Sequence, residues 1–338
     1  MKAILCAFLA ALFYAVNIPL SKLLLESVGP TTMAALLYLG AGIGVGIMAL
    51  FKRGSPKNSA PLSSSDMPFV IGMIVLDIAA PILLMLGIRH DSSANASLLG
   101  NFEIVATAVA ALFFFKETVS LRLWTAIALI TAASVILSFD GSESLRFSYG
   151  SLFVLLATVC WGFENNCTRC ISSKSTYEIV ILKGLFSGLG ALAIAFAKRE
   201  PVPGLVHICE AMILGFVAYG LSIFLYVRAQ NTLGAAKTSA YYAVAPFAGA
   251  LLSFAILGDR LSWVFLAALA IMAAGAVLVV IDTLIKHHTH PHSHIFTHCH
   301  HGILHEHTVV HSHAHDHCVN MEKHTHKHPA AQLEEFIK

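Results

Sequence analysis

Apolar windows of about 20 residues recur along most of the chain and constrain its fold more than any other feature. A helix needs roughly 20 apolar residues to cross a hydrocarbon core of about 30 Å. Each window is continuously apolar rather than alternating, which predicts helices and not barrel strands. We therefore expect an all-α integral membrane protein with ten transmembrane helices, numbered 1 to 10 in chain order. The expected spans are 3–22, 31–51, 68–88, 94–115, 121–139, 150–170, 177–197, 206–227, 236–257 and 261–285.

The composition agrees with a membrane environment. Of the 338 residues, 57% are hydrophobic and only 12% are charged, whereas a soluble domain has about 25% charged residues. The formal net charge is +2 and the basic residues are scattered along the chain, so no nucleic-acid partner is indicated. The lipid bilayer is the expected surrounding.

Two internal sequence matches predict that the chain is duplicated. Residues 9–22 resemble residues 156–169, and residues 97–140 align with residues 239–282 without a gap. Each copy has five expected helices, and an odd number makes the second copy enter the membrane from the opposite side. Inverted repeats allow a transporter to open a central site to each side in turn.

The repeat divides the chain into three expected regions. Basic residues gather on one side if the N-terminus is inside, so both termini are predicted to be cytoplasmic, in the inner membrane of the cell. The regions are 1–140 for the first five-helix repeat, 150–285 for the second and 286–338 for a cytoplasmic tail rich in histidine.

Several short motifs resemble the EamA-type transporters of the drug/metabolite transporter superfamily. Residues 96–107 read Ala-Ser-Leu-Leu-Gly-Asn-Phe-Glu-Ile-Val-Ala-Thr, and residues 114–117 read Phe-Phe-Lys-Glu. The second half contains Ala-Pro at 245–246 and Gly-Asp-Arg-Leu-Ser at 258–262. The resemblance covers residues 1–285 and implies a secondary transporter with a central cavity, which exports amino acids, metabolites or drugs. No enzyme chemistry is indicated, and the tail departs from the family pattern.

Polar residues inside the expected spans are the candidates for substrate binding. A charge near the middle of a membrane costs roughly 2.5–3.5 kcal/mol, so each one needs a partner, a wet cavity or a function. Asp77 and Glu103 lie near the centres of spans 3 and 4 and either line the cavity or are buried carboxyls held by a Ser or Asn neighbour. We expect Glu103, with Asn101 beside it, to exchange protons.

Glu164 and Lys183 lie at equal depth, each about 9 Å from the same end of its span. The equal depth predicts an ion pair that forms an inward gate or binds the two ends of a zwitterionic substrate, with a permanent structural pair as the alternative. Pro19 and Pro246 are expected to interrupt their helices, and the glycines at 40–46 to allow close helix packing. The full set of candidate substrate-binding residues is Asn17, Asp77, Asn101, Glu103, Trp161, Glu164, Asn165, Lys183, Tyr241 and Tyr242.

The tail contains all but two of the 19 histidines of the chain. Neutral imidazoles bind transition metals such as Zn, Ni, Co and Cu. The tail has few apolar residues with which to build a core, so we expect it to be disordered without metal and to have no fixed ligand set. The candidate ligands are His287, His288, His290, His292, His294, His298, His300, His301, His305, His307, His311, His313, His315, His317, His324, His326 and His328.

These features favour export of a small organic metabolite by alternating access, without a required cofactor and with protons as the coupling ion. The cavity is expected among spans 1, 3, 4, 6, 8 and 9. The first alternative is a divalent transition-metal (Ni, Co or Zn) transporter that uses the tail as collector or sensor. Metal-responsive and pH-responsive membrane sensors are further alternatives, and a homodimer is left open.

Overall fold

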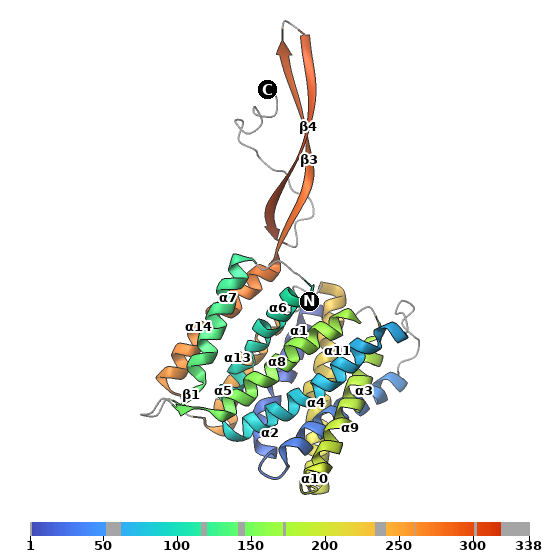
Figure 1. Ribbon diagram of the computed structural model, residues 1–338, viewed down its shortest axis with the longest axis vertical. Coiled ribbons are helices and arrows are strands. Elements are labelled where there is room, and N and C mark those ends of the chain that lie inside the picture. Colours follow the sequence, from blue (N-terminus) through green and yellow to red (C-terminus); the bar gives the residue numbers. More distant parts are fainter. Residues whose placement is uncertain are drawn as a thin grey trace. The chain divides into compact units, whose positions relative to one another are not determined.

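The computed structural model describes residues 2–51, 62–115, 120–140, 146–171, 174–233, 241–259, 261–300 and 303–318. The chain divides into two compact units, Met1–Val280 and Ile281–Lys338. The first unit is built mainly from helices and the second contains a pair of long strands (Figure 1).

The helices of the first unit follow one another with short connections. They are α1 Lys2–Ala15, α2 Asn17–Leu24, α3 Pro30–Phe51, η1 Ser64–Asp66, α4 Met67–His90, α5 Ser93–Leu99, α6 Phe102–Phe115, α7 Leu121–Leu137, α8 Tyr149–Cys170, α9 Thr176–Ala197, α10 Leu205–Gly215, η2 Phe216–Leu221, α11 Ser222–Leu233, α13 Ala245–Leu257 and α14 Trp263–Leu284. Between α7 and α8, the short strands β1 Phe139–Asp140 and β2 Arg146–Phe147 pair antiparallel.

Within the described residues, seven helical stretches are long and apolar enough to cross a membrane. Two shorter helices, α7 and α13, are also apolar. The expected span 6 is helix α8, which carries polar residues such as Glu164 and Asn165. The first unit is therefore a multi-pass membrane protein. The seven stretches are Lys2–Leu24, Pro30–Phe51, Ser64–His90, Ser93–Phe114, Thr176–Ala197, Leu205–Tyr226 and Trp263–Asp282.

Several of the apolar helical segments are interrupted. Val16 separates α1 from α2, Gly100–Asn101 separates α5 from α6, and a turn at Ala243–Val244 precedes α13. Pro19 and Pro246 explain two of the breaks, because proline has no N–H for the carbonyl four residues earlier. The expected interruption at these two prolines is confirmed. In span 8, the interruption is the π-helical turn η2.

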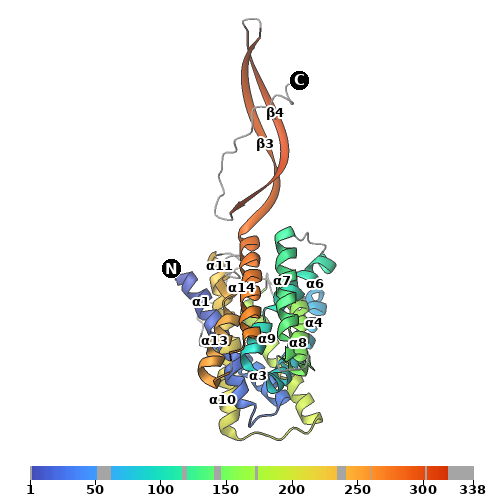
Figure 2. The same cartoon turned by 90° about the vertical axis from the view of Figure 1, so that its left-hand side faces the viewer.

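The packing of the first unit brings segments from both halves of the chain together (Figures 1 and 2). Helix α3 packs against α9 and α10, α4 against α8 and α9, α1 against α11 and α13, α6 against α8, and α5 against α13. The expected close packing by glycine is confirmed at Gly42, where a Cβ would lie 2.7 Å from the Leu185 backbone nitrogen on α9. Helices α7 and α14 lie side by side in both views, and a Cβ on Gly275 would come within 2.8 Å of Ile130.

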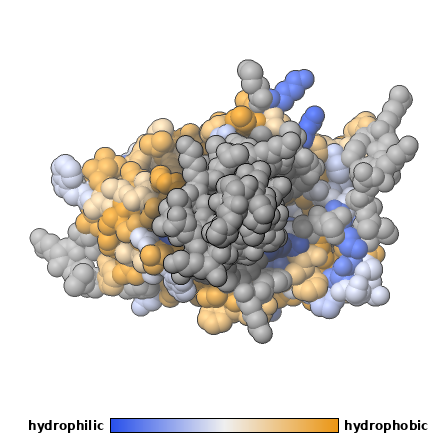
Figure 3. Space-filling model, turned by 90° about the horizontal axis from the view of Figure 1, so that it is seen from above, coloured by the Kyte–Doolittle hydropathy of each residue, from blue (hydrophilic) through white to orange (hydrophobic). Residues whose placement is uncertain are grey.

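The outer surface of the first unit is apolar. Leu50, Phe51, Leu121 and Trp263 are 82–86% exposed, and apolar side chains form much of the rim seen from above (Figure 3). Contiguous apolar surface of this kind is matched by lipid and not by water.

The second unit differs from the disordered tail that we predicted. Residues Ile285–His300 (β3) and Ile303–Cys318 (β4) form two antiparallel strands. The hydrogen bonds between strands are made by main-chain groups of residues distant in sequence, and a count of apolar residues does not report them. Of the candidate ligands, His301, His324, His326 and His328 lie outside the described residues.

Candidate functional site

A buried ion cluster joins three helices inside the first unit. The Nζ atom of Lys183 on α9 lies 3.1 Å from Asp77 Oδ2 on α4 and 2.9 Å from Glu164 Oε1 on α8. The side chains of Asp77, Glu164 and Lys183 are 0%, 2% and 14% exposed. Glu164 and Lys183 thus form the pair that their equal depth predicted, and Asp77 is an additional member.

The cluster contains two carboxyl groups and one amino group. If all three are ionised, one negative charge is in excess, and a buried charge without a partner is strongly unfavourable. A bound proton or the cationic group of a ligand would balance it. The cluster therefore has the composition of a site that takes up one positive charge.

Aromatic residues surround the cluster. The Tyr38 hydroxyl donates a 2.8 Å hydrogen bond to Asp77 Oδ1, and Trp161 Nε1 lies 3.5 Å from the Tyr38 hydroxyl. The Thr168 hydroxyl donates to Glu164 one turn earlier on α8. Trp161, a sequence candidate, thereby lies next to the ion cluster.

A second polar group lies on the other side of Tyr38. Asn17 Nδ2 donates a 3.0 Å hydrogen bond to the Tyr219 hydroxyl, and the Ser21 hydroxyl donates to Asn17 Oδ1 at 3.2 Å. The rings of Tyr219 and Tyr38 are 5.2 Å apart. Asn17 was predicted, but Tyr219 was missed, because a neutral tyrosine in an apolar window gives no signal of its own.

The row of aromatic rings continues from Tyr219 to the start of span 9. The Tyr14 ring lies 5.9 Å from Tyr219 and 6.0 Å from Tyr242, and the Tyr242 ring lies 5.1 Å from Tyr226. Tyr242 therefore belongs to the same interior region as Asn17. Tyr241 points elsewhere and packs against Phe8, with ring centroids 5.2 Å apart.

Glu103 lies in the first turn of α6, directly after the break in span 4. Asn165 Nδ2 donates a 2.7 Å hydrogen bond to Glu103 Oε1 and lies 3.3 Å from the Thr107 hydroxyl. We expected Asn101 to be the neighbour of Glu103, but Asn165 on α8 takes this place. Asn101 instead donates to the Leu98 carbonyl at 3.2 Å, because it lies in the turn that links α5 to α6.

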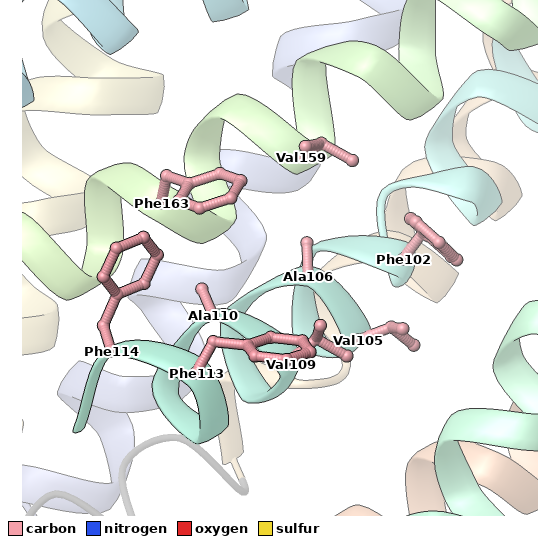
Figure 4. A pocket seen from close by; sticks show the side chains of 9 residues that line it. All are labelled: Phe102, Val105, Ala106, Val109, Ala110, Phe113, Phe114, Val159 and Phe163. Atoms are coloured by element: carbon pink, nitrogen blue, oxygen red, sulfur yellow. The ribbon is translucent and has the colours of Figure 1, made fainter. Parts of the chain in front are cut away.

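A cavity of about 450 Å³ lies between α6 and α8 (Figure 4). This cavity is bounded by spans 4 and 6 and lined by apolar side chains, and the central cavity among spans 1, 3, 4, 6, 8 and 9 stays a prediction. The Phe114 and Phe163 rings meet at its rim with centroids 5.8 Å apart. The lining is Phe102, Val105, Ala106, Val109, Ala110, Phe113, Phe114, Val159 and Phe163.

Polar contacts join helix ends at one end of the bundle, here called the Lys22 face. Lys22 Nζ lies 2.5 Å from the Ile88 carbonyl oxygen and 2.7 Å from that of Asp91, at the end of α4. Ala94 N donates to Asp259 Oδ2 at 2.8 Å. Asn95 Nδ2 donates to the Asp91 carboxylate at 3.0 Å.

Glu200 also lies on the Lys22 face. Its carboxylate accepts hydrogen bonds from Thr31 N at 3.2 Å and Thr32 N at 2.8 Å, at the start of α3. Partial burial alone would raise the pKa of Glu200, but these hydrogen bonds outweigh it and hold the pKa below its ordinary value. The opposite face has its own contact, a 3.0 Å ion pair between Asp66 and Lys174.

Among the side chains that the structure describes, no group of three or more His, Cys, Asp and Glu is arranged to hold a metal ion. The side chains of the tail are not among them. The described polar site is thus formed by carboxyl, amino, amide and aromatic groups.

Comparison with known proteins places this arrangement in a family. The EamA-like transporter family matches residues 1–139 and again residues 148–281. An uncharacterized transporter of Methanothermobacter thermautotrophicus is 23% identical, over 75% of this chain and 78% of the relative. The uncharacterized transporter YyaM of Bacillus subtilis strain 168 is 21% identical, over 81% and 90%.

One solved crystal structure is similar in fold. Its TM-score is 0.61 at 19% identity, and the match covers 83% of this chain and 97% of that chain. The family match spans nearly all of the helical unit, and both sequence relatives are named as transporters. The chain therefore belongs to the EamA-like transporter family and is a membrane transporter, not an enzyme.

Proposed function

We propose that this transporter exports a small zwitterionic metabolite, such as an amino acid, and that the cluster of Asp77, Glu164 and Lys183 binds it. The observation that carries this proposal is a buried site that combines two carboxyl groups with one amino group. The substrate carboxylate would pair with Lys183 and the substrate ammonium with the two carboxylates. Trp161 and Tyr38 would form the wall of the site.

The excess charge also suggests how transport is coupled to protons. Without substrate, one proton on the carboxylates would balance the cluster. A zwitterionic substrate adds one charge of each sign and leaves this balance unchanged, so the proton would remain in the cluster while the substrate is bound. Proton and substrate would therefore be carried across the membrane together. Glu103, held by Asn165, is a second carboxyl that we expect to exchange protons.

The proposed alternating access uses the ten-span inverted repeat, which several observations support. The family matches the chain twice. In the alignment of residues 97–140 with 239–282, the break at Gly100–Asn101 falls within one residue of the break at Ala243–Val244. The contacts also occur in equivalent pairs, because α4 with α8 corresponds to α11 with α1, and α6 with α8 to α13 with α1.

The contacts between helix ends agree with ten spans that cross the membrane in alternating directions. Lys22 contacts the end of span 3, Glu200 joins the end of span 7 to the start of span 2, and Asp259 binds the start of span 4. When successive spans alternate in direction, the ends of odd-numbered spans and the starts of even-numbered spans lie on the same face, so all these contacts belong to one face. Asp66 and Lys174, at the starts of spans 3 and 7, then lie on the opposite face. The basic residues favour the Asp66 face, and with it both termini, as cytoplasmic in an inner membrane.

The repeat also suggests the two gates. Lys22 holds the end of α4 on one face, and Arg169 is its counterpart in the alignment of residues 9–22 with 156–169. We propose that Lys22 closes the outer gate and that Arg169 closes the inner gate at the end of α11. Release of one gate and closure of the other would expose the cluster to each side in turn.

Transport by purified protein in proteoliposomes tests the proposal. We expect a pH gradient to drive amino acids, but not the matching acids that lack an amino group. The variant Lys183→Met should no longer distinguish an amino acid from its decarboxylated amine. The control Lys198→Met changes a lysine that directly follows α9 and is 47% exposed, and it should keep this distinction. Unchanged specificity in Lys183→Met would show that the cluster is only structural.

The same vesicles test the metal-transport alternative. Lys183 lies between the two carboxylates and would repel a divalent cation, so we expect no flux of Zn, Ni or Co through the helical unit. Full-length protein is compared with a chain that ends after Ile285. Metal flux that disappears with the tail would make metal the cargo, whereas amino-acid flux that survives the truncation supports our proposal.

A further inference from the structure

We propose that the apolar cavity between α6 and α8 binds one acyl chain of a bilayer phospholipid. The proposal is independent of what the transporter carries. It rests on the side of α8 that the cavity occupies, on the chemistry of its lining and on the side chains at its rim.

The cavity lies on the side of α8 that faces away from the ion cluster. Trp161 and Glu164 are buried and lie on one side of this helix. With 3.6 residues per turn, Leu156, Val159 and Phe163 lie on the other side. Val159 and Phe163 line the cavity, and Leu156 is exposed. The cavity therefore opens toward the surroundings of the helical unit and not toward its interior.

The polar contacts between α6 and α8 lie beside the cavity. Asn165 Nδ2 donates a 2.7 Å hydrogen bond to Glu103 Oε1. Asn166 Nδ2 donates a 3.2 Å hydrogen bond to the Thr107 carbonyl oxygen. None of these four residues belongs to the described lining. The polar contacts thus hold the two helices together and leave the cavity without a hydrogen-bonding group.

The lining selects an apolar occupant. All nine lining side chains are those of Phe, Val and Ala (Figure 4). A bound water molecule needs two to four polar partners, so a cavity of this kind does not hold water. An unfilled cavity destabilises a protein in proportion to its volume. At about 450 Å³, the cavity has the size of a site for a small molecule, about 300–1,000 Å³. We therefore expect hydrocarbon to fill it.

The rim favours an acyl chain over a second helix. Phe113 and Phe114, in the last turn of α6, are 74% and 68% exposed, and Phe163 on α8 is also exposed. Helices that associate in a membrane usually meet at small residues, which allow their backbones to approach closely. Large rings at the rim prevent such an approach, whereas a thin and flexible hydrocarbon chain does not need it. The bilayer around a membrane transporter supplies such chains.

Photolabelling by a lipid tests the proposal. Full-length protein is reconstituted in liposomes of phosphatidylcholine that carries a diazirine in one acyl chain. After illumination, mass spectrometry locates the labelled residues. In the original protein we expect labels to concentrate on the cavity lining of α6 and α8, above the level on the exposed apolar surface of α7 and α14.

Two variants reduce the cavity, and a third is the matched control. Val109→Phe and Ala110→Leu each add bulk to the lining. The control Val277→Phe enlarges a side chain on α14 that is 56% exposed. We expect either cavity variant to lower labelling of Val159 and Phe163 to the level on α7, and the control to leave it unchanged. Because overpacking destabilises some proteins, thermal unfolding first establishes which variants are folded, and the pattern in the original protein tests the proposal without them.

Three results would overturn the proposal. Labels spread evenly over the outer surface would mean that lipid surrounds the protein without a site. A cavity lining that stays unlabelled in the original protein would mean that something else, such as a second copy of the chain, covers it. Unchanged labelling of α8 in a folded cavity variant would place the acyl chain outside the cavity. Amino-acid transport is measured separately, and its failure would leave this site unaffected.

Discussion

Lys183 is shared by two carboxylates, and this sharing decides what each substitution in the cluster does. Loss of Asp77 or Glu164 leaves one opposite charge for Lys183 and makes the cluster neutral. Loss of Lys183 leaves two buried carboxyl groups facing one another. The three residues are therefore unequal, although all are buried and charged.

We predict that Lys183→Met destabilises the protein most, by about 3–5 kcal/mol, because it leaves uncompensated buried charge. Adding Glu164→Gln should recover part of this loss, since it removes one of the two remaining charges. The free energy of unfolding in detergent measures both effects. Equal destabilisation by Lys183→Met, Asp77→Asn and Glu164→Gln would argue against a shared charge.

Permanent neutralisation of a carboxylate should separate exchange from proton-driven transport. Asp77→Asn and Glu164→Gln each mimic a cluster that holds its proton. We expect at least one of them to exchange labelled for unlabelled substrate while losing transport driven by a pH gradient. Glu210→Gln, at a side chain that is 50% exposed, is the control and should keep both activities. Glu103→Gln with unchanged transport and unchanged pH dependence would remove Glu103 from the proton path.

The sequence revealed part of this site because membrane burial makes charge expensive. Depth along a helix was enough to predict the pairing of Glu164 and Lys183. Depth does not define which way a side chain points around its helix, so Asp77 could not be assigned to the same cluster. Tyr219 carries no charge and was invisible to this argument.

The contact between α3 and α9 depends on glycine. A Cβ on Gly184 would overlap the backbone of Gly42, whereas a Cβ on Gly46 would meet nothing within 4 Å. Gly184 also directly follows Lys183, so separation of the two helices would move the ion cluster.

We predict that Gly184→Ala lowers the free energy of unfolding by about 1–3 kcal/mol through overpacking and impairs transport. Gly46→Ala on the same helix as Gly42 should be tolerated in both respects. Thermal unfolding and proteoliposome transport of the two variants provide the comparison. Equal stability of the two variants would mean that the helices relax without cost.

Glu200 connects the loop after α9 to the first turn of α3, and we predict a pH-dependent contribution to stability. Its pKa is lowered in the folded protein, so the contribution is complete above the unfolded glutamate pKa of about 4.3 and is lost as pH falls through the lower folded value. Glu200→Gln should lose about 1 kcal/mol at neutral pH. The difference from the original protein should shrink below about pH 4. A difference that does not change with pH would contradict this role of the carboxylate.

Element boundaries were less predictable than the presence of elements. Apolar windows locate a helix because hydropathy is summed over many residues. Proline marks the breaks near Pro19 and Pro246, but Gly100–Asn101 and the π-helical turn η2 have no such mark. The strands of the tail were not predicted, because they depend on pairing between distant residues.

At the scale of the whole molecule, the proposed repeat places unlike chemistry at equivalent positions. The alignment of residues 9–22 with 156–169 sets Asn17 opposite Glu164, and extending the other alignment by its offset sets Asp77 opposite Tyr219. Each half therefore contributes one member to the neutral hydrogen-bonded pair of Asn17 and Tyr219 and one to the pair of carboxylates, Asp77 and Glu164, that Lys183 joins. The repeated scaffold can open toward either side of the membrane by equivalent movements, while its one charged pair binds one kind of ligand.

The two proposed gates follow from the same repeat and give the last prediction. Lys22→Met removes the contacts with the Ile88 and Asp91 carbonyls, so the Lys22 face should open more often. A cysteine at Ser97, which is 2% exposed, reports this in a background without other cysteines. We expect a membrane-impermeant maleimide to label it faster from the Lys22 face in Lys22→Met, but not in Lys22→Arg, which keeps the charge. Arg169→Met should speed labelling only from the opposite face. Labelling that is unchanged from both sides would identify Lys22 as a structural cap of α4, because a gate cannot lose its contact without a change in access.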